Sequence, residues 1–503
     1  MLAGSVNTNI DALYALQALQ NTDNTTSTLE QQLSSGLAIN SPADNPAGYI
    51  AAQGFTTQLG GVTQAISNAN QAISLLETAN GAITQQVNIL QSISTTANQA
   101  ANGLNSAQQL QSLQSVVSEL QSEITTIAQQ TVFGGLNLLN GSLNGVQFQV
   151  GALEGQTIQL SVPSTVATQL GANQSSASAA ATGVYPTHGK GTGGVGDVTG
   201  SSYAITSGGT GALTAGSFAI SGSAGAATIT VTAPEAASDI ASSINASTAS
   251  TNVTAAANTS VAFTATSGSV SFVLGNGAGT AGGQTNGVNI SATVSSVSQS
   301  GLQSLVQAIN QETGTTGITA TVNSSNQLVL TQSQGQNISI TGFAGTGTLK
   351  AGGTTAITLE KSGGATAATV QGLVTLQSNN TFALSANAKD IGLNTNSSLT
   401  TLASQNVSTI SGANAAINVV TFALQQLENI GAELGAVEQQ LQATASNLQT
   451  TQTNVTTARS TVQDANIPQV TTNLTQAEIL QQAGVSALAQ SQTLAQSFLK
   501  LLQ

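Results

Sequence analysis

The chain has 503 residues, enough for about three or four domains of the usual size. Only 5% of its residues are charged and its net charge at pH 7 is −13, whereas ordinary soluble proteins are about a quarter charged. The first 170 residues contain no Lys or Arg, and the cations that follow are Lys190, Lys350, Lys361, Lys389, Arg459 and Lys500. A chain with so few and such scattered cations is not expected to bind nucleic acid or an anionic membrane surface.

The chain contains no cysteine, so neither disulfides nor thiolate metal sites are available. Its first residues, MLAGSVNTNIDALYALQ, lack the positive region and apolar core of a secretory signal. No apolar run approaches the length that crosses a bilayer. We therefore expect no membrane insertion, and an export route without a cleaved signal if the protein leaves the cell.

The stretch 34–48, SSGLAINSPADNPAG, interrupts two segments with helical spacing. Gly36 can adopt the left-handed conformation that closes a helix. Pro42 and Pro46 each disfavour helical geometry in the residue before them. Asn45 followed by Pro46 is a good N-cap and first-turn pair. This stretch predicts a tight connector between two helices.

Apolar residues recur every three or four positions over 65–97, 110–127, 417–455 and 477–501, with Gln86 as one exception. Such sustained heptads predict long helices packed side by side in a coiled-coil-like bundle. The expected packing positions are Leu76, Ile83, Leu90, Leu434, Leu441, Leu448, Leu480, Gly484, Ala487, Leu494, Phe498 and Leu501.

These apolar stripes are wider than a single seam. Val62, Ile66 and Ile73 extend the first stripe sideways, and Leu488 and Leu499 extend the last one. A helix that is apolar on more than one side must be buried on several sides. Two lone helices at the ends of a chain cannot supply that cover, so the sequence predicts self-assembly.

Between the helical segments the apolar period becomes two. GVQFQV and TIQLSV flank Glu154–Gly155 and predict a β-hairpin. Residues 171–404 are rich in Gly, Ser, Thr and Ala with short alternating runs, and 239–274 aligns loosely with 305–340 as a weak repeat. The expected fold is mostly α, with β-rich domains inserted between N- and C-terminal helical arms.

No catalytic constellation is present. His188 lies in a stretch expected to be a solvated loop, and Glu119 and Glu123 lie beside an apolar stripe on a face expected to be solvated. The Gly-rich stretch 189–196 lacks the Gly-Lys-Ser/Thr ending of a phosphate loop. We expect no enzymatic activity, no metal and no cofactor.

The stretch SSGLAINSPADNPAG resembles the N-terminal signature of bacterial flagellin. Residues 64–93 resemble the first long helix of that family, and residues 434–490 are similar to its C-terminal arm almost throughout. The resemblance covers about 1–165 and 405–503. Among the departures from the family signature, its arginine is Ala38 here, and its second aspartate is Asn45.

The resemblance implies a subunit of the flagellar filament, outside the cell, exported through the flagellum's own secretion channel. Its partners would be other copies, an export chaperone, and the cap and junction proteins. The implied division pairs inner-tube helices 1–42 and 460–503, pairs shell segments 43–170 and 405–459, and places variable β-rich domains, 171–404, at the surface.

The resemblance also assigns roles to residues. The loop would join the inner-tube and shell helices where neighbouring subunits slide past one another, and its matching positions are Ser34, Ser35, Gly36, Leu37, Ile39, Asn40, Asp44 and Gly48. The expected packing positions from 480 onward would lie in the inner tube, and those from 76 to 448 in the shell.

Two other functions fit parts of the sequence. A hook–filament junction protein shares the N-terminal pattern, but the match to AEILQQAGVSALAQ favours the filament subunit. A coiled-coil surface adhesin would require a signal or an anchor.

The low charge further predicts a filament that works in an acidic medium, because near pH 3 most carboxylates are neutral and the subunit carries only about +5.

Overall fold

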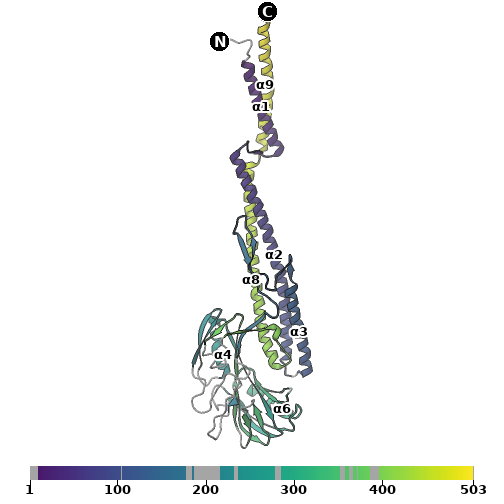
Figure 1. Ribbon diagram of the computed structural model, residues 1–503, viewed down its shortest axis with the longest axis vertical. Helices are drawn as coiled ribbons and strands as arrows, with labels where there is room; N and C mark the ends of the chain where they lie inside the picture. The colour runs from purple at the N-terminus through teal and green to yellow at the C-terminus, as the bar shows by residue number, and fades with distance from the viewer. Residues whose placement is uncertain are drawn as a thin grey trace. The chain divides into compact units, whose positions relative to one another are not determined.

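The computed structural model (Figure 1) describes residues 10–501, except 104, 177–183, 186–215, 232–235, 278–284, 324, 352–356, 362–365, 371, 386–392, 394 and 395. It contains long helices from both ends of the chain and a β-rich central region, which confirms the predicted fold class. The chain forms two compact units. Unit 1 comprises Met1–Thr78, Asn144–Ser161 and Glu433–Gln503, and unit 2 comprises Ala79–Leu143 and Val162–Ala432.

In unit 1 the two ends of the chain pair as helices. Helix α1 (Ile10–Ser35) lies alongside helix α9 (Ile467–Leu501), as Figure 1 shows. Their shared core is small, with Leu29, Val470 and Ala477 buried between them. Most other side chains of α1 are exposed. The pair therefore buries one narrow strip of a much longer surface.

Two longer helices continue the arms. Helix α2 (Pro46–Ala100) and helix α8 (Ile410–Gln463) each extend through both units. Within unit 1, Gln452 of α8 donates a hydrogen bond from Nε2 to Oγ1 of Thr63 in α2, at 3.0 Å. The heptad positions of α2 in this unit, from Val62 to Leu76, are almost fully buried.

The predicted hairpin is present in unit 1 as strands β3 (Val146–Gln149) and β4 (Thr157–Leu160), which pair antiparallel. Asn68 of α2 donates to the Gln149 carbonyl at 2.9 Å. A Cβ at Gly61 would lie 2.9 Å from the Cβ of Ala152. The glycine therefore lets the hairpin lie close against α2.

The exposed faces of the helices satisfy their polar groups without charge. Thr56, Thr63 and Thr453 each donate a hydroxyl to the carbonyl four residues earlier, at 2.9, 2.8 and 3.0 Å. Hydroxyls bonded in this way are neutral at any pH and need no partner from another helix. The arms therefore keep a polar surface with very few charged groups.

In unit 2, helix α3 (Ala107–Gln130) begins with a capping box between Ser106 and Gln109. It packs beside the unit 2 part of α2, where Gln86 occupies the exceptional slot in the heptads. Gln86 is fully buried, and its Nε2 donates to the carbonyls of Ile124 and Thr165 at 3.0 and 3.4 Å. The polar residue thus joins α2, α3 and the segment that follows the hairpin.

The central region forms sheets. The short strands β1 (Val132–Phe133) and β2 (Leu136–Asn137) pair after α3. A three-stranded sheet has the order β19–β7–β8, from Ala383–Leu384, Gly216–Gly222 and Gly225–Val231. A five-stranded sheet has the order β11–β10–β14–β17–β6, from Thr285–Val294, Gly268–Gly277, Asn337–Gly345, Ala368–Val370 and Val184–Tyr185.

The largest sheet has eight strands, with the path β12–β13–β9–β18–β5–β20 and with β15 and β16 off that path. These strands are Ile318–Val322, Leu328–Gln332, Thr254–Ala265, Leu373–Ser378, Gly171–Ser176, Ser398–Thr401, Leu349–Ala351 and Ile357–Leu359. A 3-10 turn at Leu402–Ser404 leads towards α8. Strands of this sheet and the five-stranded sheet share one core, which includes Phe263 and the stacked pair Phe272 and Phe343, whose ring centroids lie 5.9 Å apart.

The weak repeat has the same structure twice. Helices α4 (Ala237–Asn245) and α5 (Thr248–Thr251) precede β9, as α6 (Gln303–Gln311) and α7 (Thr313–Thr316) precede β12. An asparagine within the last two residues of each first helix accepts from, and donates to, the backbone of one strand residue. Asn245 bonds Ala255 at 2.7 and 2.9 Å, and Asn310 bonds Ala320 at 2.7 and 2.9 Å. The asparagine side chains therefore fix the helix–strand angle in both copies.

Replacing Asn310 by Ala should lower the stability of the second repeat copy by about 1–3 kcal/mol, because two hydrogen bonds to a strand backbone are lost. Hydrogen exchange of the amides in β12 of the full chain measures the effect. Asn289→Ala is the control, because Asn289 is exposed on β11. Equal exchange in the two variants would show that the side-chain clamp does not stabilise the repeat.

Candidate functional site at the junction of the two arms

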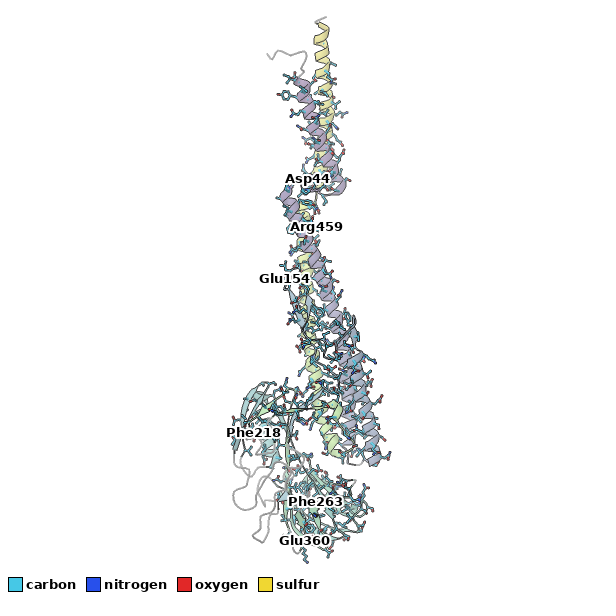
Figure 2. All side chains as sticks on the ribbon, in the orientation of Figure 1. Asp44, Glu154, Phe218, Phe263, Glu360 and Arg459 are labelled. Atoms are coloured by element: carbon cyan, nitrogen blue, oxygen red, sulfur yellow. The ribbon has the colours of Figure 1, made fainter. Side chains whose placement is uncertain are left out.

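At one place in unit 1 the helix pair α1 and α9 ends and the pair α2 and α8 begins. Helix α1 ends at Ser35 and α2 begins at Pro46, while α8 ends at Gln463 and α9 begins at Ile467. We name residues 34–48 together with 463–466 the arm junction. Figure 2 labels Asp44 in this region and Arg459 on α8 nearby. The sequence-predicted loop residues all lie in it.

Backbone hydrogen bonds join the two segments of the arm junction, residues 34–48 and 463–466. Gly36 has a φ of +74°, and its N–H still donates to the Gln32 carbonyl of α1 at 2.9 Å. The Gly36 carbonyl then accepts from Ala465 N–H at 2.9 Å, and Ala38 N–H donates to the Gln463 carbonyl at 2.7 Å. Because left-handed backbone is unfavourable for other residues, glycine at 36 sets the turn that brings these groups opposite one another.

Leu37 and Asp464 form an isolated antiparallel bridge between the same two segments. The Ser35 hydroxyl accepts from Leu37 N–H at 3.2 Å, and Asn40 Nδ2 donates to the Leu37 carbonyl at 3.1 Å. Ser34 is exposed at the end of α1. Hydrogen bonds within the loop and to the C-terminal arm therefore fix the path of the loop.

The start of α2 is packed against the loop. Ile39 is buried, and a Cβ at Gly48 would lie 2.5 Å from the Cδ1 of Ile39. Asn45 caps the helix by accepting from Gly48 N–H through Oδ1 at 3.0 Å. Asn45 therefore acts as the N-cap that the sequence predicts, and a side chain at 48 would require the Ile39 and Asn45 side chains to shift.

Asp44 holds the middle of the loop. Its Oδ2 accepts from the N–H groups of Asn40 and Ser41 at 2.9 and 2.7 Å. These two backbone donors favour the ionised carboxylate and hold the pKa of Asp44 below its ordinary value. Asp44 is exposed, so this carboxylate acts as a turn clamp and not as a buried charge.

The predicted inner-tube positions on α9 divide into three groups. Leu480 and Ala487 are exposed, whereas Gly484 faces Leu19 of α1, which lies 3.6 Å from the position of a Cβ. Gln481, the residue after Leu480, also approaches α1, and its Nε2 donates to Asp23 Oδ1 at 2.6 Å. Leu494, Phe498 and Leu501 lie in α9, but their side chains are outside the described residues.

The predicted shell positions lie in the helix cores. Leu76, Ile83, Leu90, Leu434 and Leu441 are buried, and Leu448 is half-buried. The role of these residues and of the loop in contacts between subunits stays a prediction.

Sequence reasoning missed the partner of the loop, Gln463–Ala465. The one available signal was Asn466 followed by Pro468, which resembles the cap of a new helix.

The other sequence candidates give no site. Glu119 and Glu123 are exposed, as predicted. His188 and the Gly-rich stretch 189–196 lie outside the described residues. Within the part of the chain that the structure describes, no group of three or more acidic or histidine side chains could hold a metal. None of the described helices is both long and apolar enough to cross a membrane.

Comparison with known proteins identifies the family. Three family models match: the bacterial flagellin N-terminal helical region over residues 6–144, the flagellin C-terminal helical region over 417–502, and the flagellin hook IN motif over 284–334. B-type flagellin of Pseudomonas aeruginosa is 33% identical, and the alignment covers 100% of both chains. The chain belongs to the bacterial flagellin family.

Other similarities are confined to parts of this flagellin or are distant. Flagellin B of Vibrio anguillarum is 41% identical over 32% of this chain and 43% of its own. Among solved structures, FliC from Burkholderia pseudomallei is 19% identical, with a TM-score of 0.29 over 74% of this chain and 99% of its own. Family membership makes this chain a structural subunit of the flagellar filament, in preference to the junction protein or the adhesin.

Replacing Asp44 by Ala should speed the hydrogen exchange of Asn40 and Ser41, because both amides lose their acceptor. In the parent chain this clamp is present above the ordinary carboxyl pKa and is lost as the pH falls through the lowered pKa. Protection at these amides should therefore persist below the usual titration range of Asp. Peptides covering 37–45, measured at several pH values and corrected for intrinsic exchange rates, report it.

The control is Glu30→Ala, which removes an exposed carboxylate from α1. It should leave the loop amides unchanged. Loop exchange that is the same in Asp44→Ala and in the parent chain at neutral pH would show that Asp44 does not hold the turn.

Proposed function

We propose that this flagellin polymerises by burying between neighbouring copies the apolar faces of α1 and α9 that one subunit leaves exposed. The observation that supports the proposal is the exposure of Leu13 (56%), Tyr14 (68%), Ile479 (62%), Leu480 (53%) and Val485 (52%). Full burial of a side chain of this size stabilises by about 1.5–3 kcal/mol. A few such contacts per copy are enough to favour a polymer over separate subunits.

We assign the parts of the chain to layers of that polymer. Segments 1–42 and 460–503 would form the inner tube, where α1 and α9 already pair. Segments 43–170 and 405–459 would form the surrounding shell, which includes the hairpin that lies on α2. The β-rich segment 171–404 would face solvent, since its sheets carry their own core.

In this assignment the arm junction connects the tube to the shell. Its backbone bonds between 36–38 and 463–465 would keep both arms in register while the helices on either side shift between neighbouring copies. Family membership supports secretion through the flagellar channel, delivery by an export chaperone, and contact with cap and junction proteins at the ends of the filament. The filament then lies outside the cell.

Removing about 40 residues from each end should abolish polymerisation and leave a soluble, folded remainder, because α1 and α9 are lost while the cores of unit 2 are kept. Seeded growth followed by electron microscopy measures filament formation, and circular dichroism measures the helical content of the remainder. The full chain added to the same seeds is the positive control. Seed elongation by the truncated chain would contradict the proposed role of the arms.

We further propose that the low charge adapts the filament to an acidic medium. The 19 carboxylates and six cations give a net charge of −13 at neutral pH, and packing many such copies costs self-repulsion. Protonation removes most of that charge near pH 3. The hydroxyl and amide surface of the helices does not titrate, so acid leaves these interactions unchanged.

Isolated filaments should therefore resist heat-induced dissociation better at about pH 3 than at about pH 8. Turbidity or light scattering during a temperature ramp measures the dissociation. Added salt at the higher pH should recover part of the difference, because it screens the repulsion. Filaments that fall apart at the lower pH and are most stable at the higher one would contradict the adaptation.

A further inference from the structure

The charges of unit 1 are strongly unbalanced. It contains ten carboxylates but only two cations, Arg459 and Lys500. Lys500 lies at the end of α9, where its side chain is outside the described residues. Arg459 is therefore the one cation of unit 1 whose surroundings the structure describes.

Arg459 lies on α8 shortly before that helix ends at Gln463, beside the arm junction (Figure 2). Its side chain is half-buried. Among the described residues the guanidinium has no hydrogen-bond or ion-pair partner within reach. A guanidinium carries five N–H donors, and partial burial removes part of the water that would satisfy them. The described residues of the subunit therefore supply no acceptor for Arg459.

The carboxylates of the arm junction are already engaged with neutral donors. Asp44 accepts from two backbone N–H groups, and Asp464 accepts from the Ser460 hydroxyl at 2.5 Å. The remaining exposed carboxylates of unit 1 that accept no hydrogen bond from the described residues are Asp11, Glu30, Glu77, Glu154, Glu433 and Glu478.

We propose that Arg459 pairs with a carboxylate of a second copy of this chain, and that this ion pair connects neighbouring subunits at the arm junction. Charge complementarity supports a second copy as the partner, because the described part of unit 1 presents six exposed carboxylates and one cation, Arg459, that has no partner there. The pair would also offset part of the repulsion between copies at neutral pH. The inference rests on the proposed self-assembly and names one contact within it.

The test compares Arg459→Gln and Arg459→Lys with the parent chain in seeded assembly at neutral pH. The critical concentration of Arg459→Gln should rise about three- to tenfold at low salt, since one ion pair per contact is lost. The difference from the parent should shrink at high salt, which screens the pair. Arg459→Lys should recover most of the loss, and Thr456→Gln, an exposed position on α8, is the surface control.

The unfolding temperature of the unassembled chains completes the test. Arg459→Gln should unfold at the same temperature as the parent chain. Equal critical concentrations and salt dependence in Arg459→Gln and the parent would overturn the proposal. A lower unfolding temperature of the unassembled variant that accounts for the whole defect would also overturn it, because Arg459 would then act within the subunit. Failure of the parent chain to elongate seeds would instead refute the proposed self-assembly.

If the pair exists, Arg459→Glu should assemble poorly. Reversal of one of the six carboxylates to Lys in the same chain should restore growth and identify the partner. Failure of all six reversals, with each single reversal still assembly-competent on its own, would overturn the assignment of the partner to unit 1 of a second copy.

Discussion

The structure depends on one mismatch: α1 and α9 each carry more apolar surface than the other can cover. Their shared core is limited to Leu29, Val470 and Ala477, with a few half-buried neighbours. Leu13 and Tyr14 on one helix, and Ile479 and Leu480 on the other, remain exposed. Hydrophobic free energy is proportional to the apolar area removed from water, so the exposed faces favour contact between copies. In the polymer that we propose, neighbouring copies would cover the apolar faces that α1 and α9 leave exposed in one subunit.

The near absence of charge is a second constraint on the structure, and it shows at the arm junction. Where another protein would use ion pairs, this chain uses backbone hydrogen bonds between 36–38 and 463–465 and a clamp made by one carboxylate, Asp44. The exposed helical faces are satisfied by threonine hydroxyls bonded to their own helix. In this setting the half-buried cation Arg459 stands out, because no residue in the described part of its own subunit pairs with it.

Local features were predictable from the sequence, and long-range ones were not. Gly36, Asn45 and the hairpin around Glu154–Gly155 follow rules that involve only neighbouring residues, and the structure has them as predicted. Helical spacing located the arms but could not decide which face of α9 meets α1. The structure directs Gln481 and Gly484 to α1 and leaves Leu480 exposed. The burial of Gln86 and the pairing of the loop with Gln463–Ala465 depend on contacts distant in sequence, which periodicity alone does not contain.

The most direct test of the account is hydrogen exchange in α1 and α9, measured on dissociated subunits and on the assembled polymer of the same chain. The account predicts fast exchange over both helices in the separate subunit, because their small shared core cannot hold them closed, and strong protection after assembly. Equal, strong protection of both helices in the separate subunit would contradict it, since the arms would then be complete without a second copy.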